Sequence, residues 1–178
     1  MIWGSVAESV LHRSHRPVVV VRDPRPDPGR RHFRHILHPT DFSTLSRPAM
    51  RVALELAHAH HATLRLLHVE TPHETQPAPS DAWPTQQTLD RLRHESEADG
   101  LNVVVELRTT QIHPGDEILL ASHESHSDLI VLGSHGRTGV RRLLMGSVSE
   151  FVLRSADCPT MIVRDAADQQ ESATAGPA

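Results

Sequence analysis

The residues with the clearest chemical capacity lie in a glycine-rich stretch that follows a short apolar run. The run ends at Leu132, and glycines then stand at Gly133, Gly136 and Gly146. Because glycine has no Cβ atom, backbone N–H groups at such positions can approach a ligand closely. A helix that begins near Ser147 would add N–H donors without partners inside the helix, and the positive end of the helix dipole. The stretch therefore predicts a phosphate-binding site, with donors from the following residues: Gly133, Gly136, Gly146, Ser147, Val148 and Ser149.

Charged and aromatic nitrogen groups in the same stretch could also meet a phosphate. Arg137 is expected to add positive charge there, whereas the roles of Arg141 and Arg142 stay open because arginines on loops are more often solvated. His135 faces the same side by its position, where it either contacts phosphate or fills a place in the loop. The structural alternative for the whole stretch is a turn in a protein that has lost its ligand.

The overall composition excludes several classes of protein. All 18 basic residues are arginine, and both a Walker A loop and a protein-kinase ATP site depend on a lysine that reaches the phosphates. The net charge of −4 gives no reason to expect nucleic acid. The sequence has no apolar run that could span a bilayer and no secretory signal, so we expect a protein of the cytoplasm.

Cysteine and histidine do not combine into a metal site. Cys158 is the single cysteine, which excludes an internal disulfide and predicts a small buried side chain. Among the 15 histidines, His58 and His61 have the spacing of one helix face, but no cysteine or carboxylate is placed to complete a ligand set. We expect His58, His60 and His61 to form a solvated helix face.

Apolar patterns predict five strands that alternate with helices. The strands cover 35–38, 63–69, 102–107, 128–132 and 160–163, and the helices start at Ser46 or cover 85–98, 114–124 and 147–154. The segment 71–84 contains too many prolines for regular structure and predicts a long exposed loop. This alternation indicates an α/β fold with right-handed βαβ units, in which a parallel sheet has helices on both faces. In such open sheets the ligand lies beyond the carboxyl ends of the strands, where the winding reverses.

The beginning of the chain repeats a later segment. Residues 4–23 match residues 146–165 without a gap, so both predict a helix followed by a strand. We expect residues 1–22 to be the end of a preceding unit in a tandem arrangement, and the proline-rich residues 23–32 to be a linker. Residues 33–165 then form one complete unit, and the small, polar residues 166–178 a disordered tail.

The segment GSHGRTGVRRLLMGSVSEFVLRSADCPTMIV, together with HILHPTDFS and LRLLHV, resembles the universal stress protein family. Every glycine of the pattern G-x2-G-x9-G-[S/T], which ATP-binding members of that family share, is present. The resemblance implies an open parallel five-stranded sheet of order 3-2-1-4-5, a Rossmann-like fold of the adenine nucleotide alpha hydrolase type. It also implies ATP as the ligand, with or without Mg2+. The winding then reverses between the first and fourth strands, which places Asp41 and the glycine-rich stretch on opposite walls of one cleft.

In that cleft, the end of the first strand would hold the nucleoside. Asp41 can accept hydrogen bonds from adenine or ribose groups, and Val69 can offer apolar surface to the base. A turn or helix cap is the structural alternative for Asp41, and it is compatible with ligand contact. The expected nucleotide contacts are Pro39, Thr40, Asp41, Val69, Gly133, His135, Gly136, Arg137, Gly146, Ser147, Val148 and Ser149.

The sequence favours a binding module over an enzyme. No paired carboxylates lie near the glycine-rich stretch, so we assign no catalytic residue and expect at most slow ATP hydrolysis. The resemblance implies a regulatory module of the stress response that acts through nucleotide-dependent conformation or partner binding. The alternatives are a slow ATPase, a protein that phosphorylates itself at Ser147 or Ser149, and a nucleotide-free dimerising module. An adenylating enzyme of the related pyrophosphatase type would need S-G-G-x-D-S where this chain has Pro39 to Ser43.

The last predicted strand, Thr160 to Val163, is an apolar edge that should find a partner. The resemblance implies pairing with a second copy across a dimer axis. The repeat offers another partner, because Pro17 to Val21 could supply the strand within the same chain.

Overall fold

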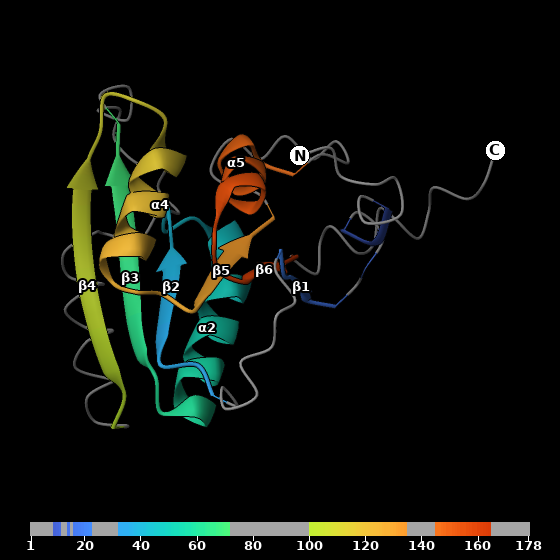
Figure 1. Ribbon diagram of the computed structural model, residues 1–178, viewed down its shortest axis with the longest axis vertical. Coiled ribbons are helices and arrows are strands. Elements are labelled where there is room, and N and C mark those ends of the chain that lie inside the picture. The colour runs from blue at the N-terminus through green and yellow to red at the C-terminus, as the bar shows by residue number, and fades with distance from the viewer. Residues whose placement is uncertain are drawn as a thin grey trace.

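The computed structural model describes residues 9–11, 14, 16–22, 32–71, 100–134 and 145–164. In these ranges the chain forms one six-stranded sheet with helices on both faces (Figure 1). The strands are β1 (Val18–Val20), β2 (His35–Pro39), β3 (Thr63–Glu70), β4 (Asn102–Thr109), β5 (Leu129–Gly133) and β6 (Thr160–Val163). The longer helices are α2 (Arg47–His60), α4 (Pro114–Glu124) and α5 (Ser147–Ser155), and a 3-10 turn, η1 (Thr44–Ser46), precedes α2. No helix among the described residues is long and apolar enough to cross a membrane.

The order of the strands is β1-β6-β5-β2-β3-β4. The five strands β2 to β6 are parallel and follow the order expected from the family resemblance, so the α/β fold is confirmed. The expected count of five strands for the sheet is wrong, because β1 adds a sixth strand at the edge. The expected helix 85–98, most of the loop 71–84, nearly all of the linker 23–32 and the tail 166–178 lie outside the described residues.

The sheet separates two apolar cores, because side chains alternate along each strand. On β2, Ile36 faces the core that α2 covers, and Leu37 faces the core under α4 and α5. Small residues of α2, such as Ala53 and Ala57, are fully buried and let this helix lie close to the sheet. Figure 1 shows α4 and α5 on one face of the sheet and α2 on the other.

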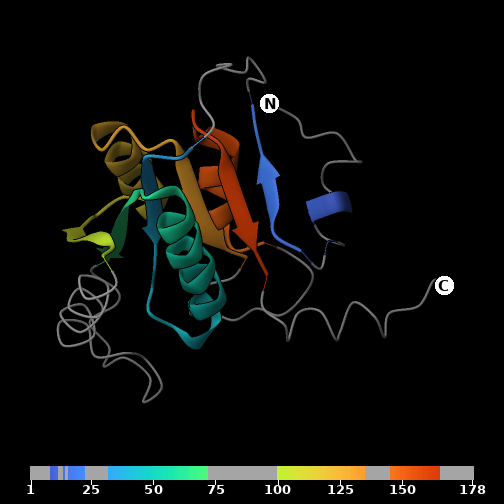
Figure 2. The ribbon, with the colours of Figure 1, turned by 90° about the horizontal axis from the view of Figure 1, so that it is seen from below.

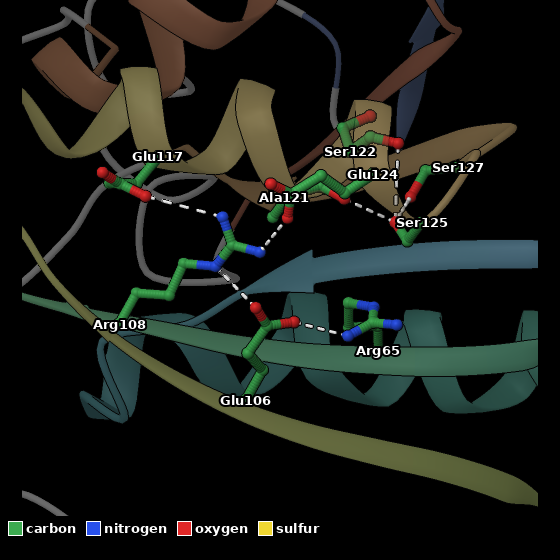
Figure 3. Close-up of polar contacts among 9 residues, drawn as sticks. All are labelled: Arg65, Glu106, Arg108, Glu117, Ala121, Ser122, Glu124, Ser125 and Ser127. Atoms are coloured by element: carbon green, nitrogen blue, oxygen red, sulfur yellow. Dashed lines mark hydrogen bonds and ion pairs between the residues drawn. The ribbon is translucent and has the colours of Figure 1, made fainter.

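An arginine joins the edge strand β4 to the helix above it (Figure 3). The guanidinium of Arg108 donates hydrogen bonds to Glu106 on its own strand and to Glu124 on α4, and it lies 3.5 Å from the carboxylate of Glu117. Glu106 also accepts a hydrogen bond from Arg65 on β3. Burial by itself would raise the pKa of Glu106, but the hydrogen bonds from both arginines outweigh burial and lower this pKa. The network fixes α4 over β3 and β4, and a lysine could not replace the three-sided contact of Arg108.

The strand β1 pairs antiparallel with β6, as Figure 2 shows for the two neighbouring arrows. Val18 lies opposite Ile162, Val19 opposite Met161, and Val20 opposite Thr160. The predicted pairing of these segments within one chain is therefore confirmed. In the repeat, Val19 corresponds to Met161, so each half of the pair meets its own counterpart about a local twofold axis. Leu11 precedes β1 and is buried in the core under α4 and α5. In the repeat it corresponds to Leu153, which is buried in the same core.

Candidate functional site

The winding of the sheet reverses between β2 and β5, so their carboxyl ends mark the expected position of a ligand. The ladder between these strands has two residue pairs, Ile36 with Leu129 and Leu37 with Ile130. Beyond these two pairs a side chain of β2 connects the strands, because Nδ1 of His38 lies 2.9 Å from the carbonyl oxygen of Val131. The two strand ends then lead into the loop after Pro39 and into the glycine-rich stretch.

His38 is a fully buried histidine next to the last residue of β2. A carbonyl oxygen can only accept a hydrogen bond, so Nδ1 of His38 must carry the proton and donate it to Val131. Burial lowers the pKa of His38 to about 4, although the bond to Val131 and the negative charge of Asp41 oppose this shift. The other ring nitrogen, Nε2, is buried and has no hydrogen-bond partner among the described residues. The imidazole of His38 is therefore neutral in the folded protein near pH 7.

The buried His38 should make the fold sensitive to acid. Its pKa in the folded state, about 4, lies below the unfolded value near 6.5, so the stability that it contributes is present above pH 6.5. As the pH falls from 6.5 through 4, His38 binds a proton in the unfolded chain but stays neutral in the folded chain. The free energy of unfolding therefore falls by about 3 kcal/mol. Denaturant titrations of the wild type and His38→Asn across this range test this, because asparagine can donate to Val131 without titrating. The variant should lose less stability in acid than the wild type, and the exposed-site control His123→Gln should follow the wild type.

The loop after β2 is held by hydrogen bonds from its own side chains. The hydroxyl of Thr40 accepts a hydrogen bond from the amide of Phe42 at 3.1 Å and donates one to the hydroxyl of Ser46 at 3.2 Å. Oδ1 of Asp41 accepts a hydrogen bond from the amide of Ser43 at 3.0 Å, which is the turn-capping role considered as an alternative. The Ser46 hydroxyl in turn donates to the carbonyl of Ser43 at 2.8 Å. The loop therefore has a defined shape, and nucleotide contact by Pro39, Thr40 and Asp41 stays a prediction.

Phe42 has a backbone conformation that is unusual for a bulky residue. Its φ angle is 57°, in the left-handed region, while its side chain is buried against the core under α2. A left-handed residue with a side chain costs about 1 to 2 kcal/mol, so the surrounding contacts must hold Phe42 in place. The ring lies 5.1 Å from that of His68 on β3, between ring centroids. Strain of this kind often marks functional loops.

The two ends of the glycine-rich stretch meet at the carboxyl end of β5. The amide of Gly146 donates a hydrogen bond to the carbonyl of Ser134 at 2.8 Å, and the hydroxyl of Ser149 donates one to the carbonyl of Gly133 at 2.8 Å. In this structure the Gly146 amide and the Ser149 hydroxyl proton thus bond the protein itself. Residues 135–144 lie outside the described residues, and with them the predicted contacts His135, Gly136 and Arg137.

The start of α5 provides donors of the kind that were predicted. Gly146 is the N-cap of α5, and among the described residues no side chain forms a cap hydrogen bond there. The amides of Ser147, Val148 and Ser149 form the first turn, where no helical carbonyl is available to them. A phosphate would fit this helix start, because the amides and the positive end of the helix dipole both favour an anion.

Val69 lies near the carboxyl end of β3 and packs against the core under α4 and α5. Val148, at the start of α5, packs against the same core. These two predicted contacts therefore share one face of the sheet.

The sequence patterns did not point to His38 or His68. Both histidines stand near the ends of apolar strand segments, HILHP and TLRLLHVE, where a buried polar group needs a hydrogen-bond partner. That position was the available signal. The partners themselves, the carbonyls of Val131 and Thr40, could not be read from spacing.

Comparison with known proteins points in one direction. The model of the universal stress protein family matches residues 32–164. Universal stress protein YxiE of Bacillus subtilis is 31% identical over 147 residues, which cover 74% of this chain and 99% of the relative. A crystal structure of a universal stress protein from Archaeoglobus fulgidus has a TM-score of 0.68 at 24% identity and covers 89% of this chain. The match covers 53% of that protein, so this chain spans about half its length. A universal stress protein solved in complex with cAMP has a TM-score of 0.55 at 22% identity, over 75% of this chain and 98% of that one.

Proposed function

The chain belongs to the universal stress protein family, and from this premise we propose that it binds an adenine nucleotide and acts as a regulatory module. The proposed ligand is ATP, with or without Mg2+. Nucleotide occupancy would set the conformation of the protein or its choice of partner in the response to stress.

The start of α5 at the carboxyl end of β5 is the observation on which this proposal depends. Its amides, from Ser147 to Ser149, have no acceptor within the helix, and the Ser149 side chain ties the helix start to Gly133. A triphosphate would accept hydrogen bonds from these amides, and the nucleoside would bind at the loop that contains Asp41. Two proteins of the same fold support an adenine nucleotide as the ligand class, since one was solved with cAMP and another, from Archaeoglobus fulgidus, with dAMP.

Slow ATP hydrolysis or self-phosphorylation is the alternative function, and the structure distinguishes between its two candidate serines. Ser147 is exposed at the start of α5, whereas Ser149 is buried and donates its hydroxyl proton to Gly133. A phosphoryl acceptor must reach the phosphate and give up its proton. Ser147 is therefore the better acceptor of the two.

We expect Asp41→Ala to weaken ATP binding about tenfold or more, because the variant loses the carboxylate that accepts hydrogen bonds from the nucleoside. The affinity for inorganic tripolyphosphate should not change, since the phosphates bind at the start of α5. Isothermal titration calorimetry with both ligands measures the two effects.

Two control variants separate the carboxylate from the turn that it caps. Asp41→Asn keeps an oxygen for the amide of Ser43 and should weaken ATP binding with the turn intact. Asp157→Ala removes an exposed carboxylate beyond the far end of α5 and should bind ATP like the wild type. A wild type that fails to bind ATP at millimolar concentration would disprove the proposed function, and an unchanged Asp41→Ala would disprove the role of Asp41 alone.

A further inference from the structure

His68 contacts both neighbours of Asp41 in the chain. Its Nδ1 lies 2.7 Å from the carbonyl oxygen of Thr40, and because that oxygen can only accept, Nδ1 carries the proton and donates it. The His68 ring also packs against the ring of Phe42, with 5.1 Å between the centroids. His68 is buried on β3, so its own position is fixed by the sheet.

The contact with Thr40 has a direct consequence for Asp41. The carbonyl of Thr40 and the amide of Asp41 belong to one planar peptide group. By holding the direction of this carbonyl, His68 therefore also fixes the orientation of the peptide plane that contains the amide of Asp41. The amide of Thr40 donates to the carbonyl of Leu67 at 2.8 Å, so both peptide groups of Thr40 are anchored to β3.

The contact with Phe42 holds the other side of Asp41. Phe42 stays in the left-handed region although its side chain disfavours that conformation. Its amide bonds the Thr40 hydroxyl, and its ring is held between His68 and the core under α2. The imidazole of His68 thus contacts the residues on both sides of Asp41.

We propose that His68 is a positioning residue of the nucleotide site, which orients the Asp41 carboxylate through its hydrogen bond to the Thr40 carbonyl. This inference rests on the proposed function, in which Asp41 receives the nucleoside. His68 itself need not touch the nucleotide.

Two substitutions at His68 test the hydrogen bond against simple filling of space. His68→Leu keeps apolar volume but has no donor, and it should weaken ATP binding about tenfold. His68→Asn loses the ring, but its amide nitrogen can take the place of Nδ1, so affinity should stay within about threefold of the wild type. The opposite order, with the asparagine variant weaker than the leucine variant, would overturn the proposal. Should His68→Leu not fold, His68→Met replaces it, because methionine also lacks the donor and adapts its shape.

The double variant His68→Leu with Asp41→Ala shows whether His68 acts through Asp41. If it does, His68→Leu should change the ATP affinity less than about twofold once Asp41 is already alanine. A further tenfold loss in that background would mean that His68 acts elsewhere, and the proposal would fall.

A measurement without nucleotide separates this proposal from the proposed function. Amide hydrogen exchange of Phe42 and Ser43, read by NMR, reports on the loop around Asp41. Exchange at both amides should accelerate in His68→Leu and stay close to the wild type in His68→Asn. Unchanged exchange in His68→Leu would contradict the positioning role, whether or not the wild type binds ATP.

Discussion

Removal of residues 1–22 is expected to shift the protein towards a dimer of doubled mass. The deletion takes away β1 and leaves the N–H and C=O groups on the outer edge of β6 without their strand partner. A second β6 can occupy the place of β1 in the same register, because Val19 and Met161 are counterparts in the repeat. Two Met161 residues would then face each other on the axis. Sedimentation velocity of the full chain and the deletion, over a range of concentrations, measures the change.

A double substitution provides a second route to the same result. The double substitution Val18→Pro with Val19→Pro breaks the ladder of β1 without shortening the chain. N–H groups alternate in direction along an antiparallel pair, so one of these two adjacent residues faces β6, and proline has no N–H group to donate. The double variant should promote the same association as the deletion, whereas Val10→Ala, at an exposed position outside β1, should not. A deletion variant with the mass of the full chain at every concentration would contradict the predicted exchange of strands.

Phe42→Gly should be more stable than Phe42→Ala, which reverses the usual ranking of these residues. Both substitutions remove a buried ring and should cost about 3 to 5 kcal/mol in the free energy of unfolding. Alanine keeps the penalty for a φ angle of 57°, whereas glycine adopts this region without strain, so the glycine variant should recover about 1 kcal/mol. Urea titrations of the two variants give the difference directly.

Phe151 supplies the matched control, because it lies inside α5 with helical backbone. There the glycine variant should be less stable than the alanine variant by about 1 kcal/mol, in line with the helix propensities. The same ranking at both positions would show that the left-handed backbone of Phe42 relaxes when the ring is removed.

The fold could be predicted well from the sequence for physical reasons that concern particular strands. Parallel strands that are buried on both faces are continuous apolar runs, so β5 and β6 were recognisable as LIVLG and TMIV. The strand β1 followed from the repeat of residues 4–23, and its pairing with β6 followed from the need to cover an edge, whereas the antiparallel direction of this pair was not predicted. The prediction of a five-stranded sheet left β1 out of the count, and with β1 the sheet has six strands.

The closeness of the two ends of the glycine-rich stretch could be predicted, but the local bonds around them could not. The glycine spacing placed Gly133 and Gly146 together, and the hydrogen bonds through Ser134 and Ser149 agree with this. The left-handed backbone of Phe42 had no signal, because a phenylalanine gives no reason to expect a positive φ angle. The partners of His38 and His68 are carbonyls from other strands, and such contacts depend on tertiary packing that a single sequence does not display.

The local axis between β1 and β6 has a consequence for how this contact can change. In an association of two identical chains, a new side chain at position 161 meets an identical copy, so a charge introduced there is repelled by itself. In the single chain the facing side chains are Val19 and Met161, encoded separately. The backbone keeps its symmetry while either side chain can mutate alone, which lets the two halves specialise without losing their contact.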